Sequence, residues 1–165
     1  YQKNSSEGSK IATASTNGTV IRIFSTENGN IIKEVRRGTD SADIYCLVFN
    51  KDSKYVACSS NTGTIHVFKI DDNEPGKQKS VLKTMTNYLG FENDYINSER
   101  SFAKFHLSYK GKNIICFNPE NNNYIIVLKY LGMCYKIFFD LDIGGDVKEA
   151  YKKDFRYLDN IEEDD

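Results

Sequence analysis

The sequence predicts an all-β fold of the WD-repeat β-propeller class, and two observations lead to that prediction. The 165 residues contain many short runs rich in β-branched and aromatic residues, separated by Gly, Asn and Asp. One of these runs recurs later in the chain at the spacing of a propeller blade. No stretch reaches the roughly 20 apolar residues of a membrane-spanning helix.

The expected strands follow one another in order, with turn residues between them. They are residues 11–15, 20–24, 31–35, 44–49, 55–59, 64–70, 101–107, 113–117, 124–130 and 134–140. The stretch 147–158 is expected to form either a last strand or a short helix. We assign residues 1–38 to a first blade, 39–108 to a second and 109–165 to a third.

The repeat favours a propeller over a sandwich or a barrel. Residues 11–24 resemble residues 56–68, and their turn glycines, Gly18 and Gly63, lie 45 residues apart. A propeller blade has a period of about 40–45 residues. A third and weaker copy covers residues 124–138. Three blades cannot close a propeller, because each blade buries its faces against two neighbours. We therefore expect further blades elsewhere in a longer chain.

A long insertion separates the second and third copies. Residues 71–99 begin with polar residues and then carry apolar side chains among lysines. Loops of this length are often functional. The segment is either a solvated loop that folds back on its own blade or a loop that inserts into membranes. The candidate membrane contacts are Leu82, Met85, Tyr88, Leu89 and Phe91.

Hydroxyl and basic side chains recur at matching positions of the first two copies. The first copy carries Thr13, Ser15, Thr19 and Arg22, and the second carries Ser60, Thr64 and His66. Ser15 is aligned with Ser60, Thr19 with Thr64 and Arg22 with His66. Hydroxyls and arginine both donate hydrogen bonds to phosphate oxygens. The alternative is that Ser and Thr are simply common in strands and turns. The third copy argues against that alternative, since it has Lys129, Met133 and Tyr135 instead.

Two consecutive arginines, Arg36 and Arg37, lie between these copies. Adjacent side chains of an extended segment point to opposite sides. We therefore expect the two arginines to reach separate anion pockets from an exposed strand end. Gly38 is expected to allow a sharp turn after the pair. Asp40 is expected to orient one arginine through a salt bridge.

Composition excludes several function classes. The net charge of −1 argues against a general nucleic-acid binder. The four cysteines form no C-x-x-C pair, which argues against a metal or redox motif and indicates reduced thiols in a cytosolic protein. His66 and His106 lie in unrelated contexts, and no nucleophile motif is present, so neither catalysis nor a cofactor is expected. We interpret His106 as structural.

The segment Glu34-Val-Arg-Arg-Gly-Thr-Asp40 resembles the L/F-R-R-G motif of the PROPPINs, seven-bladed propellers that bind phosphoinositides and include the WIPI proteins. Residues 12–22, 44–49, 59–68 and 101–105 resemble family segments in the same order. The resemblance covers nearly the whole chain. It implies that the chain contains blades five, six and seven.

The resemblance also implies a function. The ligands would be phosphatidylinositol 3-phosphate and phosphatidylinositol 3,5-bisphosphate, and the protein would move from the cytoplasm to autophagic or endosomal membranes. Protein partners in autophagy, such as a lipid-transfer protein, would bind the missing blades. One pocket would use Thr13, Ser15, Gly18, Thr19, Arg22 and Arg36, and the other Arg37, Asp40, Ser60, Thr64 and His66. Residues 71–99 would be the membrane-inserting loop of blade six. The main rival function is a WD-repeat scaffold that binds only proteins.

Overall fold

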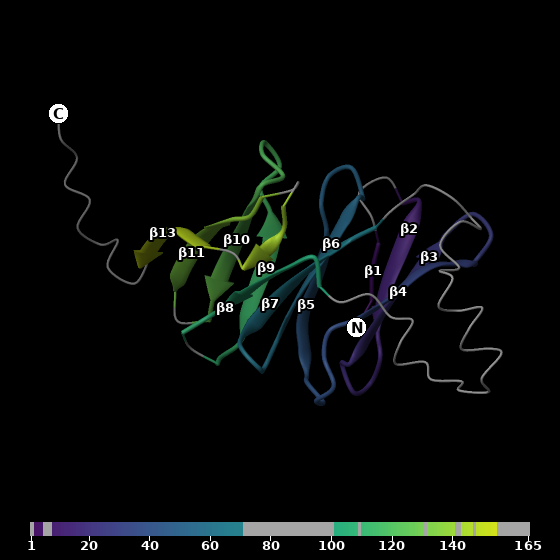
Figure 1. Cartoon of the computed structure of the whole chain (residues 1–165), viewed down its shortest axis with the longest axis horizontal. Helices are drawn as coiled ribbons and strands as arrows, with labels where there is room; N and C mark the ends of the chain where they lie inside the picture. Colours follow the sequence, from purple (N-terminus) through teal and green to yellow (C-terminus); the bar gives the residue numbers. More distant parts are fainter. Residues whose placement is uncertain are drawn as a thin grey trace.

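A computed structural model describes residues 2–4, 8–70, 101–108, 110–130, 132–140, 143–146 and 148–154. Every regular element in these residues is a β-strand, and the strands form three sheets that stand side by side (Figure 1). The all-β prediction is confirmed. The described residues contain no helix that is long and apolar enough to cross a membrane.

Sheet A is formed by the first four strands, which pair as antiparallel neighbours in chain order. They are β1 (Gln2–Asn4), β2 (Lys10–Ala14), β3 (Val20–Ser25) and β4 (Ile31–Arg36).

Sheet B has the order β12-β8-β7-β6-β5. Its antiparallel strands are β5 (Ile44–Phe49), β6 (Tyr55–Ser60), β7 (Thr64–Lys69) and β8 (Ala103–His106). The two residues of β12 (Gly145–Asp146) add to the edge of β8 in parallel.

Sheet C has the order β13-β11-β10-β9. Its strands are β9 (Asn113–Phe117), β10 (Tyr124–Lys129), β11 (Met133–Phe138) and β13 (Lys148–Asp154). The last of these shows that the described part of the stretch 147–158 is a strand and not a helix.

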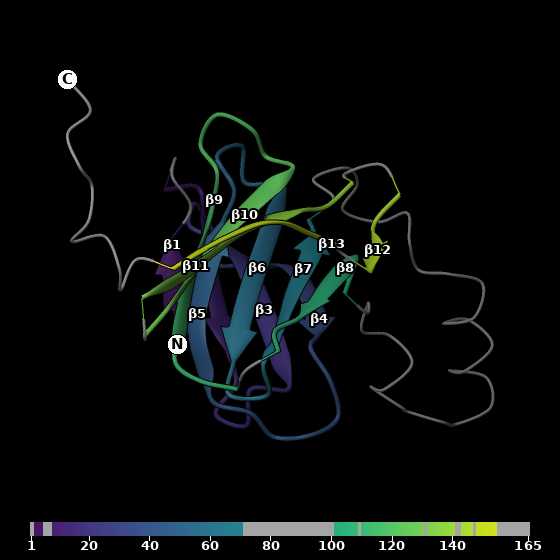
Figure 2. The same ribbon diagram turned by 90° about the vertical axis from the view of Figure 1, so that its left-hand side faces the viewer.

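Two apolar layers hold the sheets together, and sheet B contributes to both. Along β6, Val56 and Cys58 pack with sheet A, whereas Tyr55 and Ala57 pack with sheet C. All six residues of β6 are therefore buried, as expected for a strand with a neighbour on each face. The strands β1 and β9 both contact β5, so the first strands of the three sheets lie together along one edge, and Figure 2 shows all three on the same side.

The short strand β12 was not predicted. After β11 the chain crosses from sheet C to the edge of sheet B, where the Gly145 N–H donates to the Phe102 carbonyl at 2.9 Å. Gly144 has φ +68, and a Cβ there would lie 2.5 Å from the same carbonyl oxygen. Only glycine fits this close approach. The crossing ties the edges of two sheets together, and in Figure 2 β12 lies beside β8.

Candidate functional site

The repeated glycines form one recurring turn. Gly18, Gly63 and Gly132 each donate their N–H to the carbonyl three residues earlier, at 2.8, 3.2 and 3.0 Å. Their φ angles of 61°, 79° and 82° lie in the left-handed region that favours glycine. The glycines are thus explained by the backbone. The three turns end corresponding strands of the three sheets, so they share one rim of the molecule.

The strand register confirms one of the predicted equivalences and corrects another. Arg22 pairs with Thr13 in sheet A, and His66 pairs with Cys58 in sheet B, each partner lying two residues before the turn serine. Arg22 and His66 are therefore equivalent. The alignment of Thr19 with Thr64 is wrong. The turn of sheet A holds one extra residue, so Val20, whose carbonyl accepts from the Ser15 N–H, occupies the position of Thr64.

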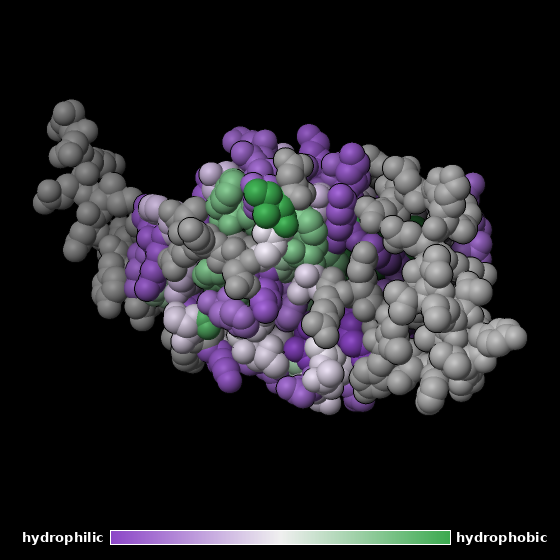
Figure 3. Space-filling view, in the orientation of Figure 1, coloured by the Kyte–Doolittle hydropathy of each residue, from purple (hydrophilic) through white to green (hydrophobic). Residues whose placement is uncertain are grey.

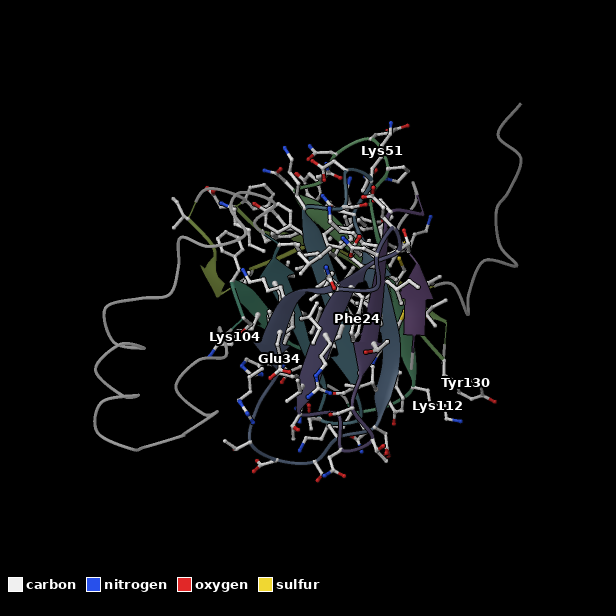
Figure 4. All side chains as sticks on the ribbon, turned by 90° about the vertical axis from the view of Figure 1, so that its right-hand side faces the viewer. Phe24, Glu34, Lys51, Lys104, Lys112 and Tyr130 are labelled. Carbon is white, nitrogen blue, oxygen red and sulfur yellow. The ribbon has the colours of Figure 1, made fainter. Side chains whose placement is uncertain are left out.

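The first polar cluster lies on the face of sheet A that points away from sheet B. Thr13, Arg22 and Glu34 form a row across β2, β3 and β4. The Arg22 Nε donates to the Glu34 Oε2 at 2.7 Å, and the two side chains are 44% and 35% exposed. Arg36 follows Glu34 by two residues and so shares its face. Figure 4, which looks onto sheet A, labels Glu34 on this face.

Ser15, Thr19 and Gly18 border this cluster at the rim. The Ser15 Oγ accepts from the Val20 N–H at 3.3 Å, and the Thr19 carbonyl accepts from the Arg37 N–H at 2.9 Å. Gly18 is buried against Ala42. These contacts join the turn of sheet A to the segment that follows β4.

Arg37 is not at an exposed strand end, which corrects the prediction. The residue is buried, with 8% of its surface exposed. The Nε donates to the Gly18 carbonyl at 2.6 Å, and the Nη2 donates to the Asp40 carbonyl. Strand alternation explains the burial, because Arg37 follows Arg36 and points to the opposite side, towards sheet B.

Two smaller expectations around the arginines are also wrong. The Asp40 carboxylate accepts a hydrogen bond from the Thr39 hydroxyl at 3.3 Å, and Arg37 binds the Asp40 carbonyl instead of forming the expected salt bridge. Gly38 does not have a positive φ, and a Cβ there would meet nothing within 4 Å. The turn after the arginine pair therefore does not require glycine.

The second polar cluster lies on the face of sheet B that points towards sheet A. The Thr64 hydroxyl and the His106 Nδ1 lie 3.0 Å apart, and His66 pairs with Lys104 on the neighbouring strand. Ile65 and Val67, which alternate with these residues along β7, are buried on the other face. Ser60 is buried, and its Oγ lies 2.8 Å from the Thr62 Oγ1.

Lys104 and His106 were not predicted as site residues, and His106 was interpreted as structural. They are brought to Thr64 and His66 by the pairing of β7 with β8. These strands flank the long insertion, and 42 residues separate Thr64 from His106. The alternating pattern Lys104-Phe105-His106 at the end of a predicted strand is the one local signal that could have indicated them.

His66 is a buried histidine in a positive electrostatic field. It is 8% exposed, and within the described part of the chain its Nδ1 has no hydrogen-bond partner. Burial, together with the nearby positive charges of Arg37, His106 and Lys104, lowers the pKa of His66 from 6.5 to about 4, and burial is the largest of these causes. His66 is therefore neutral at pH 7. Burial also raises the pKa of the neighbouring Cys58 thiol to about 12, so this thiol is unreactive.

Acidification is expected to destabilise the protein through His66. Between pH 6.5 and about 4 the unfolded histidine binds a proton and the folded one does not, so the free energy of unfolding falls as the pH is lowered. The loss should approach about 3 kcal/mol at the lower limit. Urea denaturation of wild type and of His66→Gln at pH 7, 5.5 and 4.5 measures it. We expect a smaller loss in the variant, and equal losses would contradict the assignment.

The membrane-loop candidates Leu82, Met85, Tyr88, Leu89 and Phe91 lie outside the described residues. Their role stays a prediction. Among the residues that are described, no group of three or more His, Cys, Asp or Glu side chains could hold a metal ion.

Comparison with known proteins gives consistent matches. The model of the PROPPIN family matches residues 2–148. Autophagy-related protein 18e of Arabidopsis thaliana is 36% identical over 90% of this chain and 39% of its own length. Human WD repeat domain phosphoinositide-interacting protein 1 is 38% identical over 84% of this chain and 34% of its own length. The chain thus spans less than half the length of these relatives.

Solved structures show the same fold. Hsv2 of Kluyveromyces lactis superposes with a TM-score of 0.71 at 22% identity, over 93% of this chain and 46% of that chain. A complex described as KlAtg21 with the coiled coil of AgAtg16 gives a TM-score of 0.71 at 23% identity, over 93% of this chain and 41% of that chain.

Proposed function

The chain belongs to the PROPPIN family, and from this premise we propose that it is part of a non-enzymatic propeller that binds phosphoinositide headgroups on membranes during autophagy. The names of its relatives support this proposal, since one is an autophagy-related protein and another is a phosphoinositide-interacting protein. The ligands we propose are phosphatidylinositol 3-phosphate and phosphatidylinositol 3,5-bisphosphate.

The observation that carries the proposal is the divergence of Arg36 and Arg37 at the end of β4. Arg36 belongs to the outer face of sheet A, and Arg37 lies between sheets A and B. Each arginine therefore stands near its own set of hydroxyl and basic side chains. Guanidinium and hydroxyl groups together supply the donors that a phosphate monoester needs.

We assign the residues to two pockets. The first pocket would use Thr13, Ser15, Gly18, Thr19, Arg22 and Arg36. The second pocket would use Arg37, Gly38, Asp40, Ser60, Thr64 and His66, to which we add Lys104 and His106. A phosphate in the second pocket would bring negative charge to the neutral His66 and favour its protonation. Two headgroups held by one rigid body would bind far more tightly than either alone.

Further contacts would strengthen membrane residence. Headgroup binding by itself is reversible, and stable anchoring takes a second signal. We propose that residues 71–99 supply it by inserting apolar side chains, and that the protein is recruited peripherally from the cytoplasm. We also propose autophagy proteins as partners. The solved complex of KlAtg21 with a coiled coil supports this class of partner. A lipid-transfer protein would bind blades outside this chain.

Liposome co-sedimentation of the full-length protein tests the proposal. We expect it to sediment with liposomes containing phosphatidylinositol 3-phosphate and not with liposomes containing unphosphorylated phosphatidylinositol. Lys104→Gln should weaken binding about two- to fivefold, since it removes one charge beside the second pocket. Lys51→Gln is the matched control, because Lys51 lies in the turn between β5 and β6, which Figure 4 shows at the top of the molecule and away from Lys104. Sedimentation with neither liposome would favour the protein-scaffold function.

A further inference from the structure

The two pockets differ in the groups that accept hydrogen bonds from their arginines. Arg22 in the first pocket donates to a carboxylate, the Glu34 Oε2, at 2.7 Å. Arg37 in the second pocket donates to two backbone carbonyls, those of Gly18 and Asp40. A carboxylate cancels the charge of its partner, whereas a carbonyl satisfies the donor and leaves the charge in place.

The electrostatics of neighbouring groups agree with this contrast. The positive charge of Arg37 acts to lower the pKa of both His66 and Cys58. It disfavours the protonated imidazole of His66 and favours the thiolate of Cys58. Arg37 is also buried, so solvent screens it weakly. Arg22 and Glu34 instead form an ion pair directly across two strands, and both side chains are partly exposed. Their joint charge is zero.

The position of Glu34 makes it part of the first pocket. It lies on β4, the edge strand of sheet A next to β3, two residues before Arg36 and on the same face. Any anion that approaches both Arg22 and Arg36 therefore also approaches the Glu34 carboxylate. The repulsion grows with the charge of the ligand, so it is greater for a headgroup with a second phosphate monoester than for one with a single monoester.

We propose that Glu34 is a specificity-determining residue, which restricts the first pocket to headgroups with one phosphate monoester and leaves the doubly phosphorylated headgroup to the second pocket. The inference rests on the proposed function. It assigns different ligands to the two pockets: a 3-phosphate to the outer face of sheet A and a 3,5-bisphosphate to the space between sheets A and B.

Titration of soluble headgroups into the full-length protein tests this assignment. The probes are inositol 1,3-bisphosphate and inositol 1,3,5-trisphosphate, measured by isothermal calorimetry. Inositol 1,3,5-trisphosphate should bind wild type at one stronger and one weaker site. Glu34→Gln should strengthen its binding at the weaker site about fivefold, and should strengthen the binding of inositol 1,3-bisphosphate by no more than about twofold. Glu34→Asp keeps the carboxylate and should preserve the wild-type ratio. Glu27→Gln is the matched control, since it removes the same charge at the exposed β3–β4 turn, on the opposite rim.

The outcomes separate this inference from the proposed function. A wild type that binds neither probe nor 3-phosphoinositide liposomes overturns both. A wild type that binds, with the same ratio of affinities in Glu34→Gln, overturns the role of Glu34 alone. An equal gain in Glu34→Gln and Glu27→Gln also overturns it, because net charge would then explain the effect. Thermal melting checks that each variant is folded.

Discussion

Replacing Arg36 and Arg37 together by threonine is expected to abolish binding to 3-phosphoinositide liposomes. Each charge-assisted hydrogen bond to phosphate contributes roughly 1.5–3 kcal/mol. The double change removes such bonds from both proposed pockets, and the two losses multiply when one rigid body holds two headgroups. Each single change should leave measurable residual binding. Binding should also weaken with added salt, since the contacts are ionic.

The two single variants should differ in stability. Arg36→Thr changes a partly exposed side chain and should alter the free energy of unfolding by no more than about 0.5 kcal/mol. Arg37→Thr leaves the carbonyls of Gly18 and Asp40 without this donor in a buried position, which should cost about 1–3 kcal/mol. The double variant is therefore expected to melt at a lower temperature than wild type.

Co-sedimentation and thermal melting of all three variants check these expectations together. Arg36→Thr is the informative variant for binding, because its lost affinity cannot be ascribed to unfolding. If a folded double variant still sediments with 3-phosphoinositide liposomes, the two-pocket mechanism is wrong and a protein scaffold should be preferred. If Arg37→Thr melts like wild type, its buried hydrogen bonds contribute less than the geometry indicates.

Gly18→Ala is expected to destabilise the protein by about 3 kcal/mol or more. Gly18 has φ +61, and a Cβ there would lie 1.9 Å from the carbonyl oxygen of Ala42. That oxygen cannot easily move away, since the Ala42 N–H donates a hydrogen bond to the Asn17 carbonyl at 2.9 Å. This bond fixes the segment of Ala42 against the turn of Gly18. The left-handed conformation costs about 1–2 kcal/mol for alanine, and forced overlap in a packed site adds about 1–3 kcal/mol.

Gly29→Ala separates these two contributions. Gly29 has φ +72, but a Cβ there would meet nothing within 4 Å, so only the conformational cost applies. Urea denaturation should show about 1 kcal/mol of destabilisation for Gly29→Ala and clearly more for Gly18→Ala. Equal values would show that the contact with Ala42 adjusts freely. Gly18→Ala should also weaken headgroup binding, because the Gly18 carbonyl positions the Arg37 guanidinium.

The fold class, the recurring turn and the position of the arginine pair could all be predicted from the residues along the chain. These features depend on local information. Period-two apolar patterns specify strands, a glycine with positive φ specifies the turn, and the repeat spacing specifies blades. The opposite directions of Arg36 and Arg37 also follow from local geometry, because successive side chains of a strand alternate.

The partners and the burial of each charged side chain depend on how the strands pair and the sheets pack. The pairing of β3 with β4 gives Arg22 a carboxylate partner in Glu34, and the packing of sheet A on sheet B buries Arg37 against two carbonyls. The pairing of β7 with β8 brings His106 to Thr64 across the long insertion. Apart from the contact of Arg37 with Asp40, these contacts join residues 12 to 42 positions apart, and a pattern read along the chain specifies neither strand partners nor burial. Burial and charge partners set the electrostatics of an anion site, so those properties emerge only when the sheets are assembled.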